Sequence, residues 1–588
     1  MAGRDVAGWG AKYFVACWVC ALSFAGSLAC STSDGGGGAS GSGGTAGANP
    51  GGAGGGAGAV AGAGAPSMGG ASGAASGASG GVGASAGKST GAAGGSGNGG
   101  AAGAANSMGG AGAGGAAGMA NGGPGGAGAG GVGPLVDTVT LTPSTYAFRH
   151  FAIETNSDGV WNGGASPAGQ PITTMYDTVV LENGYLKVTV LPSYGGRVLS
   201  IVHKPTNREL LYQNPLGTPY LMQEDIFYYD YLVIMGGIFP SFPEPEHGKY
   251  WNQPYDYEVV SQSAEAITIK MSRKDDRDLV AGVPERYDVG RTDVLVQVEV
   301  TLRAGSSALE LATTLTNTRS SAVPSFEYWT VTTLAPGSTP GQTAIPLDTR
   351  IQARMDQVHC LESSWAWFGD AEDRVDGEVF KWNNLSYFKN WTDQGTAFAN
   401  PKYAANWSGL SNYANDTSIL RVSENVKTPG LKLWTFGKQS LDIDIDDAEQ
   451  WLRPTIEMWH GVTPEFWARG TLAANEVRTW TDRYFATLGV KEITAASEYG
   501  AVYLSSSADA GNTTLSAAAT LVVPNQTVHA ILRLGGNVVV EKDVTVAATD
   551  ATTVTATVPS TDAGAGAVFA VEFLQGDKSL LGAQTTLK

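Results

Sequence analysis

Short runs of alternating apolar and polar residues, separated by turn residues, dominate the chain from residue 135 onward. Residues 177–192 show this most plainly, because two such segments flank Asn183-Gly184, a typical two-residue connection of a β-hairpin. Gly195-Gly196 marks the next turn. Further strand-like runs lie at residues 198–202, 266–271, 294–302, 309–315 and 419–422. Helical periodicity is scarce, so the pattern predicts an all-β protein built as an antiparallel sandwich.

The end of the chain carries a second, different pattern. Tryptophan is absent after Trp480, and Val, Thr and Ala alternate in short runs such as 520–523, 529–533 and 567–573. This alternation in short runs predicts a separate small immunoglobulin-like β-sandwich over residues 489–588. It follows a large β-domain predicted over residues 135–488.

The amino terminus has the pattern of an export signal. Arg4 and Lys12 precede an apolar run of 17 residues, 13–29, which ends in small residues before Cys30. The Ser-Leu-Ala-Cys ending at 27–30 resembles the lipobox of bacterial lipoproteins, in which the cysteine is lipidated. Residues 1–30 are therefore predicted to be an export signal, with lipidation at Cys30 as the only attachment to a membrane. The predicted location is the cell surface or outer membrane, and an ordinary cleaved signal with secretion is the alternative.

Residues 31–134 contain almost nothing to bury. Between residues 35 and 134 lie 45 of the 82 glycines, and Lys88 is the only charged residue there. Such a segment cannot offset the entropy lost on ordering its backbone, so we predict a disordered Gly/Ala-rich tether.

Charge and motif content exclude several classes of ligand. Residues 135–588 carry 52 acidic and 33 basic residues, a net charge of −19, which repels nucleic acid. Asp442, Asp444 and Asp446 alternate along a predicted strand, where carboxylates about 6–7 Å apart seldom converge on one ion. No P-loop or zinc-ligand spacing is present. We therefore expect no nucleic-acid partner, no metal and no other cofactor.

Aromatic residues are concentrated in the large predicted domain. Of the 15 tryptophans, 13 fall between Trp161 and Trp480, together with many tyrosines. Flat aromatic rings stack on the C–H faces of sugars, and neighbouring carboxylates bind the hydroxyl groups. Most of these rings are expected to fill a large core, but their number favours a sugar site over a lipid pocket.

An ordered series of short motifs spans roughly residues 177–488. It includes Glu-Asn-Gly-Tyr-Leu-Lys-Val-Thr-Val-Leu-Pro at 182–192 with Gly-Gly-Arg at 195–197, Tyr-Gln-Asn-Pro at 212–215, Gly-Gly-Ile at 236–238, His-Gly at 247–248, Pro-Gly-Leu-Lys-Leu-Trp at 429–434 and Ile-Glu at 456–457. The series resembles the galactose-mutarotase-like superfamily, and within it most closely the domain of unknown function 5107 family. The resemblance implies a β-supersandwich with a concave sugar-binding face. The chain departs from that family's pattern at Phe239, where Glu is usual.

Two residues in these motifs have side chains suited to acid/base chemistry. Opening a sugar ring at its anomeric centre needs a base for the anomeric hydroxyl and an acid for the ring oxygen. The resemblance implies that Glu457 and His247 form this pair. Glu457 is expected to be the base, because neighbouring tryptophans raise the pKa of a shielded carboxylate, and His247 the acid. A loop-stabilising histidine and a strand-end salt bridge are the structural alternatives.

Four further residues are expected to bind the substrate. Arg197 has the fork of donors that grips a carboxylate such as that of a uronate, but it can equally pair with an internal carboxylate and order the turn. Trp251 and Tyr231 are expected near the floor of the site, and Trp459 beside the catalytic pair.

These features predict an exported carbohydrate-active protein whose ligand is a saccharide or glycan. One interpretation is an enzyme acting on sugars or oligosaccharides by acid/base chemistry, of the epimerase, lyase or hydrolase type. The alternatives are a non-catalytic cell-surface glycan-binding protein and a structural role at the cell surface.

Overall fold

The computed structural model describes residues 137–150, 171–217, 236–243, 247–278, 289–360, 373–391, 395–400, 403, 405–435, 437–438, 455–465, 468–490 and 492–588. All of them belong to one compact unit. The predicted export signal and tether, Cys30, Tyr231 and the aspartates at 442, 444 and 446 lie outside the described residues.

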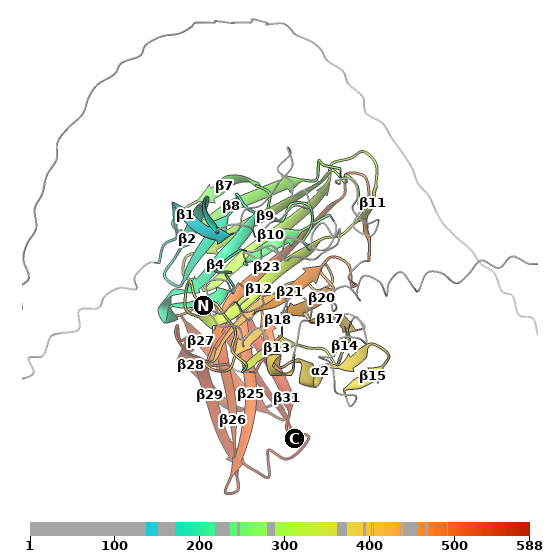
Figure 1. Ribbon diagram of the computed structural model, residues 1–588. Helices are drawn as coiled ribbons and strands as arrows, with labels where there is room; N and C mark the ends of the chain where they lie inside the picture. Colours follow the sequence, from blue (N-terminus) through green and yellow to red (C-terminus); the bar gives the residue numbers. More distant parts are fainter. Residues whose placement is uncertain are drawn as a thin grey trace, which may run out of the picture. The chain divides into compact units, whose positions relative to one another are not determined.

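Thirteen of the described strands form one antiparallel sheet, which we call the large sheet (Figure 1). Their order is β1-β2-β3-β4-β5-β12-β21-β20-β17-β14-β16-β15, and β6 pairs with both β4 and β12. The strands are β1 (Thr140–His150), β2 (Ile172–Glu182), β3 (Leu186–Leu191), β4 (Arg197–His203), β5 (Arg208–Leu211), β6 (Ile238–Ser241), β12 (Trp329–Ser338), β14 (Gln357–Cys360), β15 (Arg374–Asp376), β16 (Val379–Lys381), β17 (Gly395–Asn400), β20 (Gly430–Thr435) and β21 (Ile456–Gly461).

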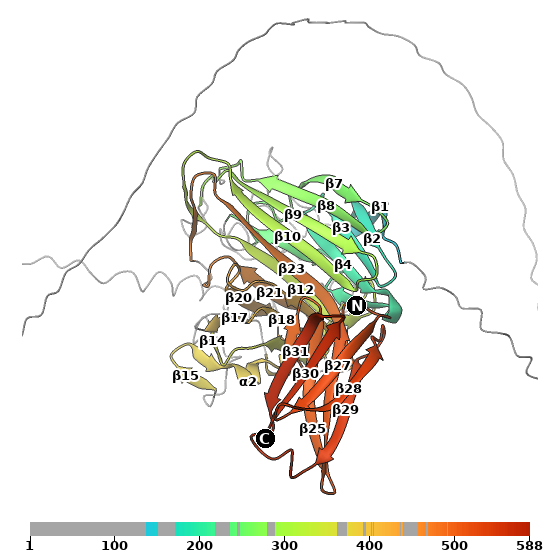
Figure 2. The same cartoon turned by 180° about the vertical axis from the view of Figure 1, so that it is seen from behind.

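A second antiparallel sheet contains eight described strands in the order β13-β18-β19-β23-β10-β9-β8-β7. Figure 2 shows β7 to β10, coloured green, running side by side next to β23. The strands are β7 (Asp256–Gln262), β8 (Ala266–Lys274), β9 (Val294–Arg303), β10 (Ala308–Asn317), β13 (Thr349–Ala353), β18 (Trp407–Asn412), β19 (Thr417–Val422) and β23 (Val477–Leu488). A smaller sheet pairs β11 (Val323–Phe326) with β22 (Gly470–Leu472).

Helices are short throughout the described part of the chain. They are α2 (Trp382–Leu385) and the 3₁₀ turns η1 (Lys204–Thr206) and η4 (Phe388–Asn390). Among the described residues, no helix has the length and apolar character needed to cross a membrane.

The main core lies between the two large layers, because each layer turns one apolar face inward. Along β9 the residues at 294, 296, 298, 300 and 302 are buried, and those between them are half-buried. Leu181 and Val188 of the large sheet and Ile269 and Leu311 of the second sheet belong to the same core cluster. Burial of each such aliphatic side chain contributes about 1.5–3 kcal/mol, so this shared face holds the two sheets together.

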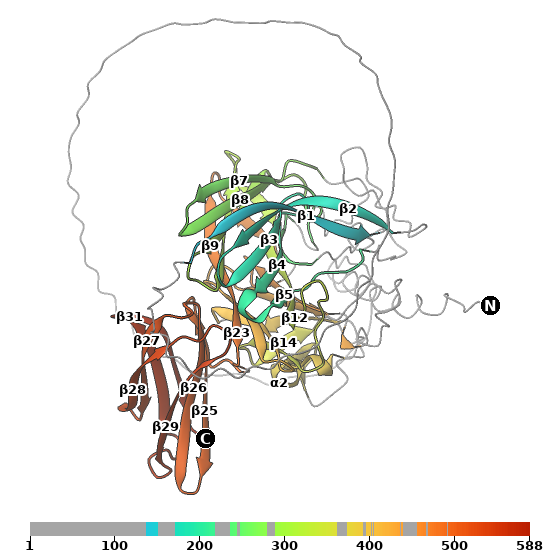
Figure 3. The ribbon, with the colours of Figure 1, turned by 90° about the vertical axis from the view of Figure 1, so that its left-hand side faces the viewer.

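The last eight strands form a small two-sheet sandwich (Figure 3). The sheet orders are β24-β25-β26-β29 and β28-β27-β30-β31. The strands are β24 (Ala495–Ser497), β25 (Gly500–Asp509), β26 (Asn512–Leu521), β27 (Thr527–Leu534), β28 (Asn537–Thr545), β29 (Thr552–Pro559), β30 (Val568–Gln575) and β31 (Lys578–Thr586). This sandwich has its own core, which includes Leu532 and Phe573. An ion pair of 2.8 Å between Arg483 and Glu498 joins it to β23.

The predicted all-β fold class is confirmed, and the hairpin at Asn183-Gly184 shows why the local prediction succeeded. The Asn183 side-chain oxygen accepts hydrogen bonds from the backbone N–H groups of Tyr185 and Leu186, at 2.8 and 2.7 Å. An asparagine in a turn stabilises the chain reversal in this way. The boundary at 488/489 stays a prediction, because the strands on both sides of it belong to one compact unit.

Candidate functional site

The face of the large sheet that points away from the main core carries a second cluster, which we call the aromatic face. In β21, Ile456 and Met458 belong to the main core, and Trp459 belongs to this second cluster. Because side chains alternate along a strand, Glu457 points to the aromatic face as well. The cluster comprises Phe148, Leu191, Tyr194, Leu199, Phe239, Trp251, Trp329, Val331, Phe398 and Trp459, with Tyr146 and Tyr176 packed against it and partly exposed.

Strand register arranges the aromatic face in rows. Successive cross-strand partners in one row are Phe239, Val331, Trp459, Lys432, Phe398 and His359, on β6, β12, β21, β20, β17 and β14. In the neighbouring row, Glu457 lies between Thr333 and Trp434. Directly paired side chains on one face of a sheet lie close enough to interact. The register therefore brings Glu457, Trp459 and Lys432 into one patch.

Trp459 connects the two candidate catalytic residues. Its indole Nε1–H donates a hydrogen bond of 2.8 Å to Oε2 of Glu457. The centroid of its ring lies 5.2 Å from that of the His247 imidazole. The Lys432 Nζ lies 4.0 Å from the centroid of the same ring. Trp459, Lys432 and Glu457 are 0, 1 and 3% exposed, so a carboxylate, an ammonium group and an imidazole share a buried site around one indole.

His247 reaches this site from a loop with a strained backbone. Its φ of 65° is in the left-handed region, which costs a non-glycine residue about 1–3 kcal/mol. Next to it, Gly248 has a φ of 74°, and a Cβ there would lie 2.3 Å from the Phe242 carbonyl oxygen. The loop has to fold this way for the imidazole to lie against Trp459.

A buried ion pair anchors the loop that carries His247. The Lys249 Nζ lies 3.2 Å from Oδ1 of Asp275, and both side chains are buried. The Tyr250 hydroxyl donates to the same oxygen at 2.9 Å, and the Thr292 backbone N–H donates to Oδ2 at 2.7 Å. Removing one partner of a buried ion pair is strongly destabilising, so this contact fixes the loop to the end of β8.

The surroundings of His247 keep its imidazole neutral. Burial, and then the positive charges of Lys432 and Arg197, lower the pKa of His247 to about 3. Its Nδ1 is buried and has no hydrogen-bond partner in the described part of the chain. With this pKa, His247 cannot act as the proton-donating acid expected from the sequence. At pH 7 the ring can donate or accept a hydrogen bond, but it holds no imidazolium proton.

The structure does not support the substrate-binding role expected for Arg197. Its Nε, Nη1 and Nη2 donate to the carbonyl oxygens of Tyr194, Gly236 and Trp251 at 2.7, 2.9 and 2.6 Å. The guanidinium carbon also lies 4.4 Å from the centroid of the Phe239 ring. Since all three nitrogens bind backbone carbonyls and the side chain is buried, the guanidinium orders the protein's own backbone. Among the described residues, none of its hydrogen-bond partners is a carboxylate.

Of the other two residues predicted at the floor of the site, the structure describes Trp251 but not Tyr231. Trp251 lies on the aromatic face, with ring centroids 6.0 Å from Tyr194 and 6.4 Å from His247. Tyr231 lies outside the described residues. Lys432 is a site residue that sequence reasoning missed. The signal available was a single lysine between two leucines in the Pro-Gly-Leu-Lys-Leu-Trp motif at 429–434.

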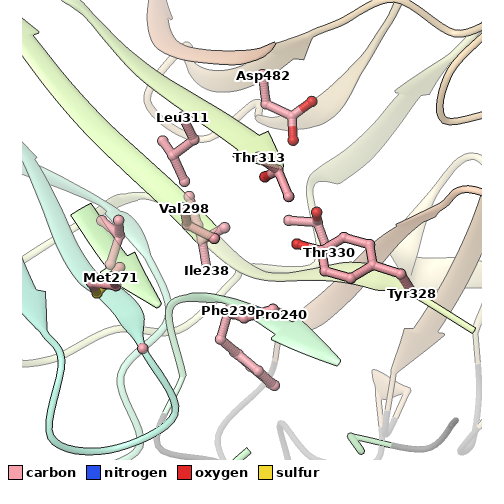
Figure 4. Close-up of a pocket in the computed structure, with 12 residues that line it drawn as sticks. Ile238, Phe239, Pro240, Met271, Val298, Leu311, Thr313, Tyr328, Thr330 and Asp482 are labelled. Atoms are coloured by element: carbon pink, nitrogen blue, oxygen red, sulfur yellow. The ribbon is translucent and has the colours of Figure 1, made fainter. Parts of the chain in front are cut away.

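Two hollows elsewhere in the molecule differ from the aromatic face. A cavity of about 10 Å³ between the two large layers is lined in part by Val298, Thr313 and Asp482 (Figure 4), and has room for about one water molecule. A groove of about 470 Å³ is lined by Arg354, which follows β13, and by residues of the small sandwich such as Arg533, and its lining contains no aromatic ring within the described residues. No group of three or more His, Cys, Asp or Glu side chains in the described ranges is arranged to hold a metal ion.

Replacing Arg197 with Met is expected to lower the free energy of unfolding by about 2–5 kcal/mol, because three buried carbonyls lose their donor. Arg197→Lys keeps the positive charge but has fewer hydrogen-bond donors in a different geometry, so the free energy of unfolding should fall by less than in Arg197→Met. Urea unfolding measures the effect, with Arg303→Met, a change at a mostly exposed arginine, as the control. Wild-type stability in Arg197→Met would contradict the structural role.

Comparison with known proteins gives one family match. The model of the family described as "Domain of unknown function (DUF5107)" matches residues 163–289. That segment contains Arg197, the Gly236-Gly237 pair and His247, three of the features on which the resemblance was based.

Several solved structures are also similar. A TPR-domain containing protein from Parabacteroides distasonis is 17% identical with a TM-score of 0.46, and the match covers 60% of this chain and 56% of that chain, little more than half of its length. A galactose mutarotase-like protein from Clostridium acetobutylicum is 12% identical with a TM-score of 0.35, over 53% of this chain and 95% of that one. A galactose mutarotase related enzyme from Lactobacillus acidophilus is 13% identical with a TM-score of 0.32, over 54 and 100%. The family-model match by itself confirms the resemblance to the DUF5107 family, over residues 163–289.

Proposed function

We propose that the protein binds a saccharide on the aromatic face and that Glu457 exchanges a proton with the bound sugar. The observation that carries this proposal is the contact of Trp459 with both Glu457 and His247. Burying a carboxylate and an imidazole among aromatic rings is unfavourable for folding, and such groups are concentrated at functional sites. The partly exposed rings of Tyr146 and Tyr176 at the edge of this cluster offer apolar surface to the C–H face of a sugar, and polar groups bind its hydroxyls.

Glu457 is suited to be the base of a ring-opening reaction. The Trp459 N–H holds one carboxylate oxygen and so orients the group. The carboxylate takes the proton of the anomeric hydroxyl as the bond from the anomeric carbon to the ring oxygen breaks. His247, as the tautomer with hydrogen on Nδ1, donates a hydrogen bond to the ring oxygen, where negative charge develops, and that oxygen takes up a proton from water to become the hydroxyl group of the open-chain sugar.

Glycan binding without turnover is the second candidate, and the state of His247 favours it. A histidine with a pKa of about 3 does not supply an imidazolium proton at neutral pH. A neutral imidazole and an indole-bound carboxylate form a competent set of hydrogen-bonding groups for sugar hydroxyls even when no bond is broken.

Substitutions at Glu457 and Trp459 separate the two candidates. For an enzyme, Glu457→Gln should lower turnover about 100-fold or more and keep affinity within about threefold, since the amide cannot accept the proton. Trp459→Ala should weaken binding at least about tenfold in either case, because the indole orients Glu457 and packs against His247. Turnover and calorimetric affinity are measured on glycans selected from an array, with Glu265→Gln at an exposed turn as the control.

Binding of the wild-type protein to the glycan array tests both candidate functions. Affinity without turnover in the wild-type protein would support the glycan-binding candidate. The absence of affinity for neutral and uronate-containing glycans would contradict both candidates.

We also infer that the protein is exported and held at a membrane by a lipid on Cys30. The basic residues before the apolar run at 13–29 and the small residues before Cys30 support this inference. A long Gly/Ala-rich segment behind such an anchor would allow a sugar-binding domain to stand clear of the surface.

Replacing Cys30 with Ser is expected to move the protein from the membrane fraction to the soluble fraction, because the acyl chains are lost. Cell fractionation with immunodetection measures the change, and Ser27→Ala serves as a control that keeps the cysteine. An unchanged membrane fraction in Cys30→Ser would contradict lipid anchoring at this residue.

A further inference from the structure

The small cavity between the two large layers has polar side chains in its lining. Its volume is about 10 Å³. The polar side chains are Asp482 of β23, Thr313 of β10, Thr330 of β12 and Tyr328, which stands just before β12. Figure 4 shows the side-chain oxygens of these four residues grouped around one space. The rest of the lining is largely apolar and includes Val298, so the polar atoms are confined to one part of the wall.

Two of these oxygens have no hydrogen-bond partner. Thr330 is 5% exposed and Asp482 is 1% exposed, and among the described residues nothing bonds to Thr330 Oγ1 or to Asp482 Oδ2. A buried polar atom left unsatisfied keeps the full penalty of its desolvation. Because the two oxygens belong to different sheets and line the same cavity, one small molecule between them would satisfy both.

The charge of Asp482 favours a neutral ligand. Its Oδ1 lies 2.7 Å from Nη2 of Arg421, and both side chains are buried. The same guanidinium nitrogen donates to Thr428 Oγ1 at 2.9 Å. Since this ion pair already compensates the carboxylate, a cation would not be favoured at Oδ2. A calcium ion would also need about six to eight oxygen ligands, more than the lining of this cavity provides.

The size and chemistry of the cavity match those of one water molecule. A volume of about 10 Å³ is close to the minimum that holds a water, and a buried water makes about three hydrogen bonds. Thr330 Oγ1 and Asp482 Oδ2 offer two acceptors. Burial raises the pKa of Tyr328, so its hydroxyl keeps its proton at neutral pH and can act as a donor.

We propose that one water molecule is bound in this cavity and bridges Asp482 Oδ2 of the second sheet to Thr330 Oγ1 of the large sheet. It donates one hydrogen bond to each of these oxygens and accepts one from the Tyr328 hydroxyl. The water is a structural ligand, separate from the saccharide site. Thr330 lines the cavity between the layers, whereas its chain neighbours Trp329 and Val331 belong to the aromatic face. The bridge therefore ties the second sheet to the strand that carries part of that face.

A high-resolution crystal structure of the full chain tests the proposal directly. Density for one water is expected about 2.5–3.0 Å from both Asp482 Oδ2 and Thr330 Oγ1. Crystals under xenon pressure provide a second measurement, because a dry apolar cavity binds xenon. A cavity without density, at a resolution that shows other buried waters, would overturn the proposal. Xenon in the cavity would overturn it as well.

Variants at Thr330 test the bridge in solution. Thr330→Val keeps the shape of the side chain and removes one oxygen ligand, so oxygen-17 relaxation of water should report one long-lived water fewer than in the wild type. The ratio of folded to unfolded protein should fall about 5- to 100-fold in urea unfolding. Thr330→Ser should keep the water. Thr314→Val, at a half-buried position of β10 next to Thr313, is the control.

An unchanged number of long-lived waters in Thr330→Val would overturn the bridge to Thr330. If this variant does not fold, the wild-type crystal structure still decides whether the water is bound.

Discussion

The site depends on one buried guanidinium. Arg197 binds the carbonyl oxygens of three segments that lie far apart in sequence: the turn before β4, the glycine pair before β6 and the loop that carries Trp251. Two glycines make this approach possible, because a Cβ at Gly195 or Gly236 would lie 2.0 Å from a carbonyl oxygen. Two backbone hydrogen bonds, Gly195 N–H to Gln253 O and Tyr255 N–H to Pro192 O, join the same loop to the turn between β3 and β4. The Lys249–Asp275 ion pair holds the same loop from the other side.

The second constraint is the alternation of side chains along the strands of the large sheet. One set of residues, such as Ile456 and Met458, builds the main core, and the other set builds the aromatic face. Because strand register is fixed by the buried set, the position of Glu457 and Trp459 on the opposite face is fixed as well. The sheet that stabilises the fold therefore also positions Glu457, Trp459 and Lys432.

Local features of the fold were predictable from the sequence, and long-range contacts were not. The Asn183-Gly184 hairpin and the alternating strand at 294–302 follow from turn chemistry and from a period of two. The resemblance to a sugar-active superfamily brought His247 and Glu457 together as a hypothesis, and the structure places both against Trp459. The role of Arg197 was not predictable, because the sequence around an arginine is the same whether its guanidinium binds backbone carbonyls or a ligand. Lys432 was missed because a lysine in a strand usually faces solvent.

The most direct measurement for the saccharide site is a crystal structure of the protein with a bound glycan. The account predicts density for the sugar in contact with Trp459, with its oxygens within hydrogen-bond distance of Glu457 and His247. Density in the groove beside Arg354 and Arg533, with the aromatic face unchanged, would contradict it.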